Sequence, residues 1–330
     1  MIELIFTIDY EIYGNGEGSL RELIYEPAEK LKAIFRKWKV RFVAFVEVAE
    51  LQMIEVKGTD SAISLVKQQI KSFLEEGFEI GLHLHPQWYN GQYENGKWAL
   101  DYSEYNLCKL PRDRIVEIAD RSLAYLRNTV GVDKFAPLSF RAGNWLFQPT
   151  QPAAKVLAAR GIRIDSSVFK GGRQHQHNLD YRRALRNGYY WKFAEHVDVP
   201  DTKGTLIEIP IYAQMVPFWK MLTSKRVSLQ QRASSTAQTS KERLYRFLDF
   251  LRFYHPLKFD FCRMTIDEFI LMIDTLIEED KYDPMSFRPI VAIGHTKDLV
   301  DFETVESLLS YLAQKGITIS TFQDIHYRCK

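Results

Sequence analysis

The alternation of short apolar runs with longer amphipathic stretches constrains the fold of this chain more than any other feature. Apolar runs of strand length recur along nearly the whole sequence, and stretches with helical periodicity separate them. This order is typical of a mostly parallel sheet wrapped by helices. The predicted strands cover residues 2–9, 41–48, 78–83, 137–141, 162–165, 206–211, 289–294 and 317–320.

The predicted helices fill the intervals between these strands. The stretch 111–130 is the clearest, because Pro111 suits a first turn, apolar residues recur on one face and Gly131 can end the helix. About eight strands with intervening helices favour a distorted (β/α)7–8 barrel over an open doubly wound sheet. The other predicted helices cover residues 27–38, 60–76, 151–160, 241–253, 266–280 and 302–315.

We expect one domain over residues 1–330, since a chain with 46% hydrophobic residues can bury one large core. Residues 216–263 interrupt the alternation and are predicted to be an insertion on the barrel. Between Lys220 and Lys258 this insertion carries nine basic residues and two acidic ones. That composition suits a membrane surface or a pyrophosphate-bearing substrate, and equally the solvated face of a helix.

Composition also bears on partners and location. A formal net charge of +2 is too balanced to require nucleic acid as a partner. The sequence contains no apolar run of the roughly 20 residues needed to span a bilayer, and residues 1–6 resemble a buried strand instead of a secretion signal. Three widely spaced cysteines form no CxxC pair. We therefore expect a soluble, cytoplasmic protein.

Four short motifs directly follow predicted strands, which is where barrel enzymes assemble their sites. Two histidines at i and i+2 in extended chain point the same way, so both can bind one ion if a carboxylate supplies a third ligand. The first motif offers two carboxylates at the same spacing. The motifs are Thr7-Ile8-Asp9-Tyr10-Glu11, Gly81-Leu82-His83-Leu84-His85-Pro86, Ser139-Phe140-Arg141-Ala142-Gly143-Asn144-Trp145 and Gly294-His295-Thr296.

Other residues near these motifs have more than one interpretation. Arg141 can neutralise the buried carboxylates or form an ordinary structural salt bridge. Trp88, Tyr89 and Trp145 can stack on a sugar ring or simply pack. A second pair, His175 and His177, lies in a polar run without strand context, and we predict a surface loop there.

Two histidines and a carboxylate do not fix the chemistry by themselves. Non-haem iron oxygenases use the same ligand set, although usually on an all-β scaffold that the alternation disfavours. An HxH pair can also open an amidohydrolase barrel, but it should then end the first strand. In this chain a carboxylate motif precedes the histidines.

The order of the motifs resembles that of the NodB-like polysaccharide deacetylases, the superfamily of carbohydrate esterase family 4, in a divergent branch. The resemblance is carried by TxDxE, HxH, FRAGxW, GIRIDSS and GHT, and it extends over nearly the whole chain. It implies the distorted barrel of that superfamily and a hydrolytic, metal-dependent deacylation of a carbohydrate.

The resemblance also implies roles for the first two motifs. Asp9 corresponds to the catalytic base of the superfamily's TFDDG motif. Tyr10 stands where the second, metal-binding aspartate would be, so Glu11 is expected to bind the metal together with His83 and His85. The superfamily usually spaces its histidines as HxxxH, and whether Asp9 or Glu11 is the ligand stays open.

The later motifs complete the implied site. Arg141 corresponds to the arginine that orients the base, Asp165 to the acidic residue that steadies the acid histidine, and His295 to the general acid. One divalent ion is expected, Zn²⁺ first, with Co²⁺, Ni²⁺, Mn²⁺ or Fe²⁺ as alternatives. The expected substrate-binding residues are Tyr10, Trp88, Asn144 and Trp145.

Together these features predict a metal-dependent hydrolase that removes an acetyl or formyl group from the nitrogen of an amino sugar in cell-surface polysaccharide biosynthesis. The sugar is expected to be nucleotide-linked, lipid-linked or part of an oligosaccharide. Peripheral contact of the basic insertion with a membrane fits the second of these. Two alternatives remain, namely a hydrolase of another C–N bond (a formamide or cyclic imide) and a non-catalytic carbohydrate-binding barrel.

Overall fold

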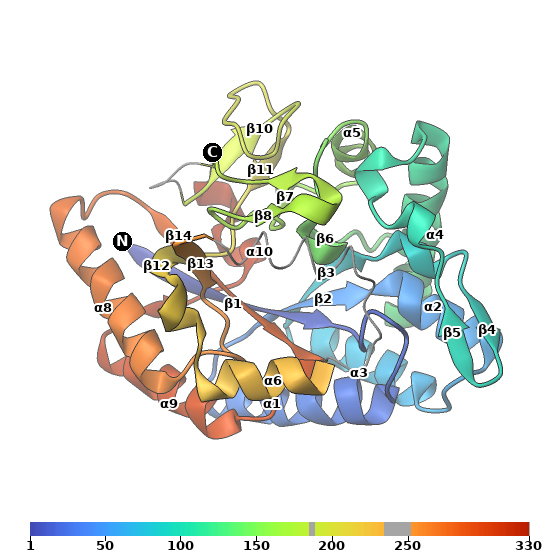
Figure 1. Cartoon of the computed structure of the whole chain (residues 1–330), viewed down its shortest axis with the longest axis horizontal. Helices are drawn as coiled ribbons and strands as arrows, with labels where there is room; N and C mark the ends of the chain where they lie inside the picture. The colour runs from blue at the N-terminus through green and yellow to red at the C-terminus, as the bar shows by residue number, and fades with distance from the viewer. Residues whose placement is uncertain (185–188, 234–251, 330) are drawn as a thin grey trace.

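The protein is built around one curled, mostly parallel sheet with helices around it (Figure 1). The computed structural model describes residues 1–184, 189–233 and 252–329. Within them, the main path of the sheet runs in the order β10 (Trp191–Phe193), β11 (Leu206–Glu208), β7 (Ile164–Asp165), β6 (Ser139–Ala142), β3 (Glu79–Leu84), β2 (Val43–Glu47), β1 (Ile2–Tyr10) and β14 (Arg288–His295).

All neighbours on this path are parallel except β10, which pairs antiparallel with β11. A short strand, β15 (Thr318–Ile319), pairs with the start of β1. The chain beyond β11 reaches β14 at Ile211, which bridges both Phe169 and Val291. The sheet is therefore a curled half-barrel, and this confirms the predicted distorted α/β barrel.

The helices that cover the sheet follow the strands along the chain. The π-helical turn η1 (Arg21–Tyr25) leads into the first of them. They are α1 (Glu26–Lys37), α2 (Val48–Lys57), α3 (Ile63–Glu75), α4 (Arg112–Val130), α5 (Ala153–Ala158), α8 (Ile266–Tyr282), α9 (Phe302–Gln314) and α10 (Phe322–Ile325).

Every predicted strand is present within a few residues, but α2 was not predicted. It begins directly after β2 without a turn, and its N-cap is Glu47 instead of one of the residues that usually mark a helix start. The helix 111–130 is confirmed, with Pro111 at the N-cap and Gly131 at the C-cap with a φ of 72°. Most of the predicted helix 241–253 lies outside the described residues, and residues 252 and 253 are not helical.

The core lies on both faces of the central strands, where aromatic residues join helices to sheet. β1 and β14 are buried along almost their whole length, as expected for parallel strands covered on both faces. Phe35 of α1 makes edge contacts with Phe6 and Phe42, and Phe42 does so with Phe73 of α3, at centroid distances of 5.2–5.4 Å. This packing fixes the middle of β1 against α1.

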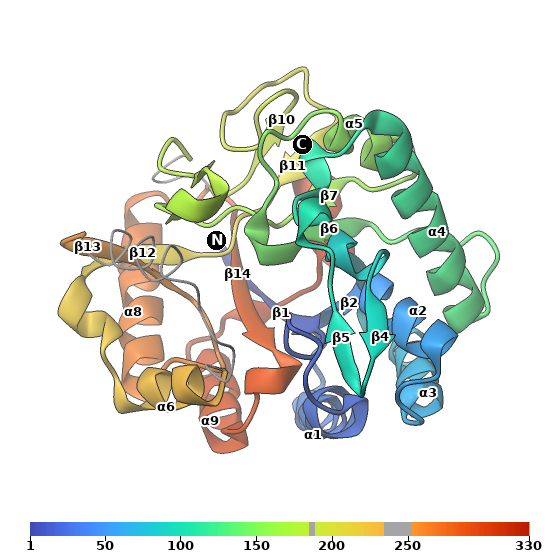
Figure 2. The same ribbon diagram turned by 45° about the vertical axis from the view of Figure 1, so that its right-hand side comes forward.

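The described part of the predicted insertion forms an antiparallel ribbon with a helical segment at one end. β12 (Ala213–Pro217) pairs with β13 (Tyr254–Lys258), and η7 (Phe218–Met221) and α6 (Ser224–Ala233) follow β12. Both views show this ribbon beside α8 (Figures 1 and 2). After β13 the chain runs along β14, where Phe261 N donates to Ile293 O at 2.9 Å. The end of the insertion is thus brought to the same edge of the sheet as His295.

Two further β-hairpins form small sheets separate from the main sheet. β4 (Gln92–Glu94) pairs with β5 (Lys97–Ala99), and β8 (Arg173–Gln174) with β9 (Leu179–Asp180). None of the described helices is long and apolar enough to cross a membrane.

Candidate metal centre and active site

The candidate site lies at the carboxyl ends of β6, β3, β1 and β14, with β2 between β3 and β1. Strand register sets Asp9 of β1 opposite His295 of β14, and His83 of β3 opposite Arg141 of β6. These ends surround a cavity of about 200 Å³. Its lining residues are Asp9, Glu11, Gly14, His83, His85, Ala142, Asn144, Trp145, Lys258, Asp260, Arg263, His295 and Lys297.

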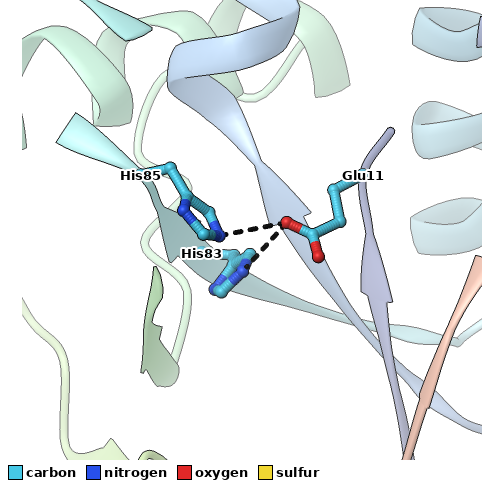
Figure 3. Close-up of side chains that lie close together, drawn as sticks. All are labelled: Glu11, His83 and His85. Carbon is cyan, nitrogen blue, oxygen red and sulfur yellow. Dashed lines mark ion pairs between the residues drawn. The ribbon is translucent and has the colours of Figure 1, made fainter. Parts of the chain in front are cut away.

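Three buried side chains converge on one point of this cavity. Glu11 Oε2 lies 3.5 Å from His83 Nε2 and 3.1 Å from His85 Nε2 (Figure 3). The two imidazoles point the same way, as the i, i+2 spacing predicts. Two imidazole nitrogens and one carboxylate oxygen are a donor set for a divalent cation. Asp9, Glu11 and His295 form a second group whose possible ligand atoms also lie within 4.8 Å of one another.

The hydrogen bonds of the two Nδ1 atoms show whether Nε2 of each histidine is free to bind a metal ion. His83 Nδ1 lies 2.8 Å from Arg141 O, so Nδ1 donates and Nε2 is left free to bind an ion. His85 Nδ1 lies 3.2 Å from Gln87 Nε2, while the buried Gln87 Oε1 has no hydrogen-bond partner among the described residues. Turning this amide over would let Oε1 accept the Nδ1 proton of His85. Asn144 Nδ2 also lies 3.2 Å from His85 Nδ1, and the same turn of the Asn144 amide would give both imidazoles the tautomer of a metal ligand.

The second oxygen of Glu11 is held by a lysine. Lys297 Nζ donates to Glu11 Oε1 at 2.6 Å and to Ile12 O at 3.1 Å. Burial opposes ionisation of Glu11, but Lys297 and the histidines outweigh it and hold its pKa well below the ordinary value. Burial likewise lowers the pKa of His83, yet the charges of Asp9 and Glu11 raise it to about 9. The metal-free triad is thus an anionic Glu11 beside a protonated His83, and a cation that binds His83 Nε2 would displace that proton.

Asp9 is fixed by a fully buried arginine. Arg141 Nη1 donates to Asp9 Oδ1 at 2.6 Å, and the rest of the guanidinium donates to Ser166 O, Ser166 Oγ and Thr7 Oγ1 at 2.9–3.2 Å. Burial raises the pKa of Asp9, but Arg141 and the nearby histidines outweigh burial and lower it. Asp9 is therefore ionised and oriented with its second oxygen toward His295.

His295 lies on the other side of Asp9. Its Nε2 is 3.4 Å from Asp9 Oδ2, and its Nδ1 is 4.0 Å from Asp298 Oδ2. Asp298 is itself bound by Arg263 at 2.5 and 3.0 Å. The carboxylate near His295 Nδ1 is therefore that of Asp298. The residue before His295 has to be glycine, because a Cβ on Gly294 would lie 2.4 Å from Phe261.

Asp165, the acidic residue expected beside His295, lies outside the described lining of the cavity. Its carboxylate accepts from Ser167 Oγ at 2.7 Å and from Ser167 N at 3.2 Å, and it interacts with the buried Glu208. It is fully buried and is not among the described residues that line the cavity. The position expected for Asp165, beside the acid histidine, is occupied by Asp298 in this structure.

Two of the expected substrate-binding residues face away from the cavity. Tyr10 alternates with Asp9 and Glu11, so its ring points to the helical layer, where its hydroxyl donates to Gln69 of α3 at 2.5 Å. Trp88 is 1% exposed and packs against Trp98 at a centroid distance of 5.0 Å. Both residues belong to the core, and neither is retained in the proposal below.

Asn144 and Trp145 do line the cavity. They have positive φ angles of 51° and 61°, which are uncommon for residues other than glycine. Asn144 Nδ2 lies 3.2 Å from His85 Nδ1. Before them, Gly143 allows close contact with the histidine motif, because a Cβ there would lie 2.6 Å from Leu84 O and 2.7 Å from His85 Nδ1. The FRAG turn therefore packs directly against the second histidine.

His175 and His177 form the short 3-10 helix η6 (His175–His177) and are absent from the described lining of the cavity. The His177 ring packs against Tyr105 at 4.8 Å. This placement agrees with the predicted loop, and these histidines are not part of the proposed site.

Two buried carboxylates next to the triad, those of Glu47 and Glu50, were not predicted from the sequence. Glu47 lies opposite His83 in register, accepts from His85 N at 2.8 Å and caps α2 through Glu50 N. Burial raises its pKa to about 8. Glu50 accepts from Ile12 N at 2.9 Å, just after Glu11. Glu47 could have been found by the rule used for the other motifs, since it is next to the last residue of the predicted strand 41–48 and ends β2.

Comparisons with known proteins place the fold. No protein-family model matches the chain, and neither does any curated protein. A solved structure assigned as a polysaccharide deacetylase from Mycobacterium smegmatis is 15% identical over 99% of this chain and 90% of that one, with a TM-score of 0.56. The allantoinase Puue is 12% identical over 98% and 88%, with a TM-score of 0.50. A GH57 branching enzyme from Thermococcus kodakaraensis is 12% identical over 99% and 71%, at 0.55.

The structure thus has a curled half-barrel like the deformed barrel of the NodB type, and it shares this fold over its full length with polysaccharide deacetylases and an allantoinase. Because a branching enzyme has a similar fold, the fold alone does not select a reaction. The buried group of Glu11, His83 and His85, which could bind a divalent metal, is the feature that bears on the chemistry.

Proposed function

We propose that this protein is a metal-dependent hydrolase that removes an acetyl or formyl group from the nitrogen of an amino sugar in cell-surface polysaccharide biosynthesis. The observation that carries the proposal is the convergence of Glu11, His83 and His85 in a cavity that also contains Asp9 and His295. A divalent cation held by these three ligands, Zn²⁺ by preference, would supply Lewis acidity that acidifies a water molecule and polarises the acyl carbonyl.

The remaining residues would move the protons. Arg141 holds Asp9 Oδ1, so Asp9 Oδ2 is free to accept the proton of the attacking water. His295 Nε2 lies 3.4 Å from that oxygen, and this contact would shorten to a hydrogen bond for the proton to pass to the imidazole. From His295 the proton would go to the amine nitrogen as it leaves. The charge of Asp298, which Arg263 holds 4.0 Å from His295 Nδ1, would favour the protonated imidazole.

We place this reaction in the cytoplasm, near a membrane surface. Three buried free thiols, Cys108, Cys262 and Cys329, are in keeping with a reducing compartment. The insertion exposes a group of aromatic side chains in edge contact with one another, which would suit the headgroup region of a bilayer. They are Trp219, Phe253 and Tyr254, each more than half exposed.

A second candidate is hydrolysis of a cyclic amide on the same fold. The likeness to an allantoinase favours it, since ring opening of a cyclic amide needs the same attack of water on a carbonyl next to nitrogen. It differs in the substrate, which would be a small heterocycle instead of a sugar.

The test is an assay of the purified protein loaded with one equivalent of Zn²⁺, Co²⁺ or Mn²⁺. The substrates are N-acetyl and N-formyl amino sugars, free and nucleotide-linked, together with a cyclic ureide. We expect acetate or formate release that stops when the metal is chelated and returns when it is added back. Opening of the cyclic ureide without deacylation of any sugar would favour the second candidate. Inactivity of the metal-loaded protein on every substrate would contradict both.

A further inference from the structure

One of the basic side chains that line the cavity has no ion-pair partner in the part of the chain that the structure describes. Three lining residues have basic side chains, namely Lys258, Arg263 and Lys297. Lys297 is paired with Glu11, and Arg263 with Asp298. For Lys258 the described residues offer no carboxylate within the 4.0 Å of an ion pair. Among the described residues, Lys258 is therefore the basic side chain of this cavity that no carboxylate pairs with directly, and Asp260 acts on it only from a longer distance.

Lys258 is held in place by aromatic rings instead. Its Nζ lies 3.4 Å from the centroid of Trp145 and 4.8 Å from that of Phe169. A cation–π contact attracts the ammonium but leaves its charge uncompensated. The side chain is half-buried, and burial lowers the pKa of Lys258 to about 7 against the opposing effect of Asp260. An anion bound beside the ammonium would raise the pKa of Lys258 again, because it would stabilise the charged form that burial disfavours.

The support for this lysine is rigid on both sides. Lys258 is the last residue of β13, and it lies opposite Ala213 in the antiparallel pairing of β13 with β12. Trp145 has a left-handed backbone, and its carbonyl accepts from the Tyr181 hydroxyl at 2.6 Å. Backbone strain held in place by surrounding contacts clusters at ligand-binding positions. Lys258 and Trp145 thus come from segments far apart in the chain and meet at the edge of the cavity.

We propose that Lys258 binds an anionic group of the substrate, a carboxylate or phosphate borne on the amino sugar or attached directly to it. This inference rests on the proposed function, since it names the substrate class of the same site. The anion must be close to the reacting acyl group, because Lys258 and Asp9 line one cavity of about 200 Å³. A neutral sugar would leave the half-buried ammonium without a counter-charge, which is unfavourable.

The experiment compares three soluble substrates that share one N-acetyl group. They are N-acetylglucosamine, N-acetylglucosamine 6-phosphate and N-acetylglucosaminuronic acid, which separate phosphate from carboxylate. In the wild-type enzyme we expect at least one anionic substrate to have a KM about tenfold to a hundredfold lower than the neutral one, the effect of a charge-assisted hydrogen bond. Lys258→Met should remove this preference by raising KM for the anionic substrate to that for the neutral one, while the bound metal stays unchanged.

Two further variants separate charge from packing. Lys258→Arg keeps a cation over Trp145 and should recover most of the preference. Lys220→Met removes an equal charge from an exposed position of the same insertion and should behave as the wild type. If Lys258→Met raised KM for neutral and anionic sugars alike, the lysine would only support Trp145, and the inference would be wrong.

Binding measured by calorimetry separates failure of this inference from failure of the proposed function. If no sugar is hydrolysed but an anionic sugar binds to the wild type and not to Lys258→Met, the anion site stands and the deacylase proposal falls. If the neutral sugar is hydrolysed and bound as well as both anionic ones, the deacylase proposal stands and the anion site is refuted.

Discussion

Replacing Arg141 by methionine should destabilise the protein strongly, because it would leave Asp9 buried without its partner. Arg141 is completely buried, and its guanidinium donates hydrogen bonds to Asp9, Thr7 and Ser166. Removal of one partner of a buried ion pair typically costs about 3–5 kcal/mol. Since domains are stable by only about 5–15 kcal/mol, this is a large share of the total.

The assay is urea unfolding followed by circular dichroism, with Arg160→Met as a matched control. Arg160 also makes a two-pronged pair, with both Asp120 carboxylate oxygens at 2.6 and 2.8 Å, but at the surface, where such pairs contribute about 0–1 kcal/mol. The double variant Asp9→Asn with Arg141→Met removes the stranded charge and should lose less than the two single losses combined. A loss for Arg141→Met no larger than for Arg160→Met would refute the idea that this pair organises the site.

Four further predictions follow from the same structure. His83→Ala or His85→Ala should each lower the bound metal measured by atomic absorption, and full stoichiometry in either variant would remove that residue from the ligand set. His295→Ala should keep its metal and lower kcat by about 10²–10⁴-fold with little change in KM, so that turnover near the wild type would exclude it as the acid. Burial raises the pKa of Glu79 to about 7 from an ordinary 4.5, so the folded protein retains a proton there that the unfolded chain has released. Stability should therefore fall as pH rises from about 5 to 7, by up to about 3 kcal/mol, and urea midpoints of Glu79→Gln should lack this part of the fall. Trp219→Ala should weaken binding to anionic vesicles at low salt in a sedimentation assay, and equal binding by variant and wild type would argue against membrane contact through the insertion.

The sequence was sufficient to predict the features that depend on local periodicity. Strand-length apolar runs located the sheet, and the i, i+2 spacing correctly indicated that His83 and His85 point the same way. The same rule, applied to the first motif, would have shown that Tyr10 points away from Asp9 and Glu11 and into the helical layer. The expectation for Tyr10 followed its place in the family motif instead of the alternation of the strand.

The features that could not be predicted depend on contacts between distant segments. Asp298 reaches His295 through a turn after β14, and the motif order alone had favoured Asp165. Lys258 enters the cavity because β13 pairs with β12 and the following residues run along β14. Neither the register of that ribbon nor its path over the barrel is encoded in a local pattern. Trp88 was adjacent to a ligand motif in sequence, but it packs inward against Trp98.

The position of a bound ion is the most direct test of the central claim. A crystal of the protein grown with Zn²⁺ should be measured at wavelengths on both sides of the zinc absorption edge, and the anomalous difference map should be searched for the ion. We expect one peak about 2.0–2.2 Å from Glu11 Oε2, His83 Nε2 and His85 Nε2. A peak held instead by Asp9, Glu11 and His295, or a cavity without any ion at saturating Zn²⁺, would contradict the metal centre described here.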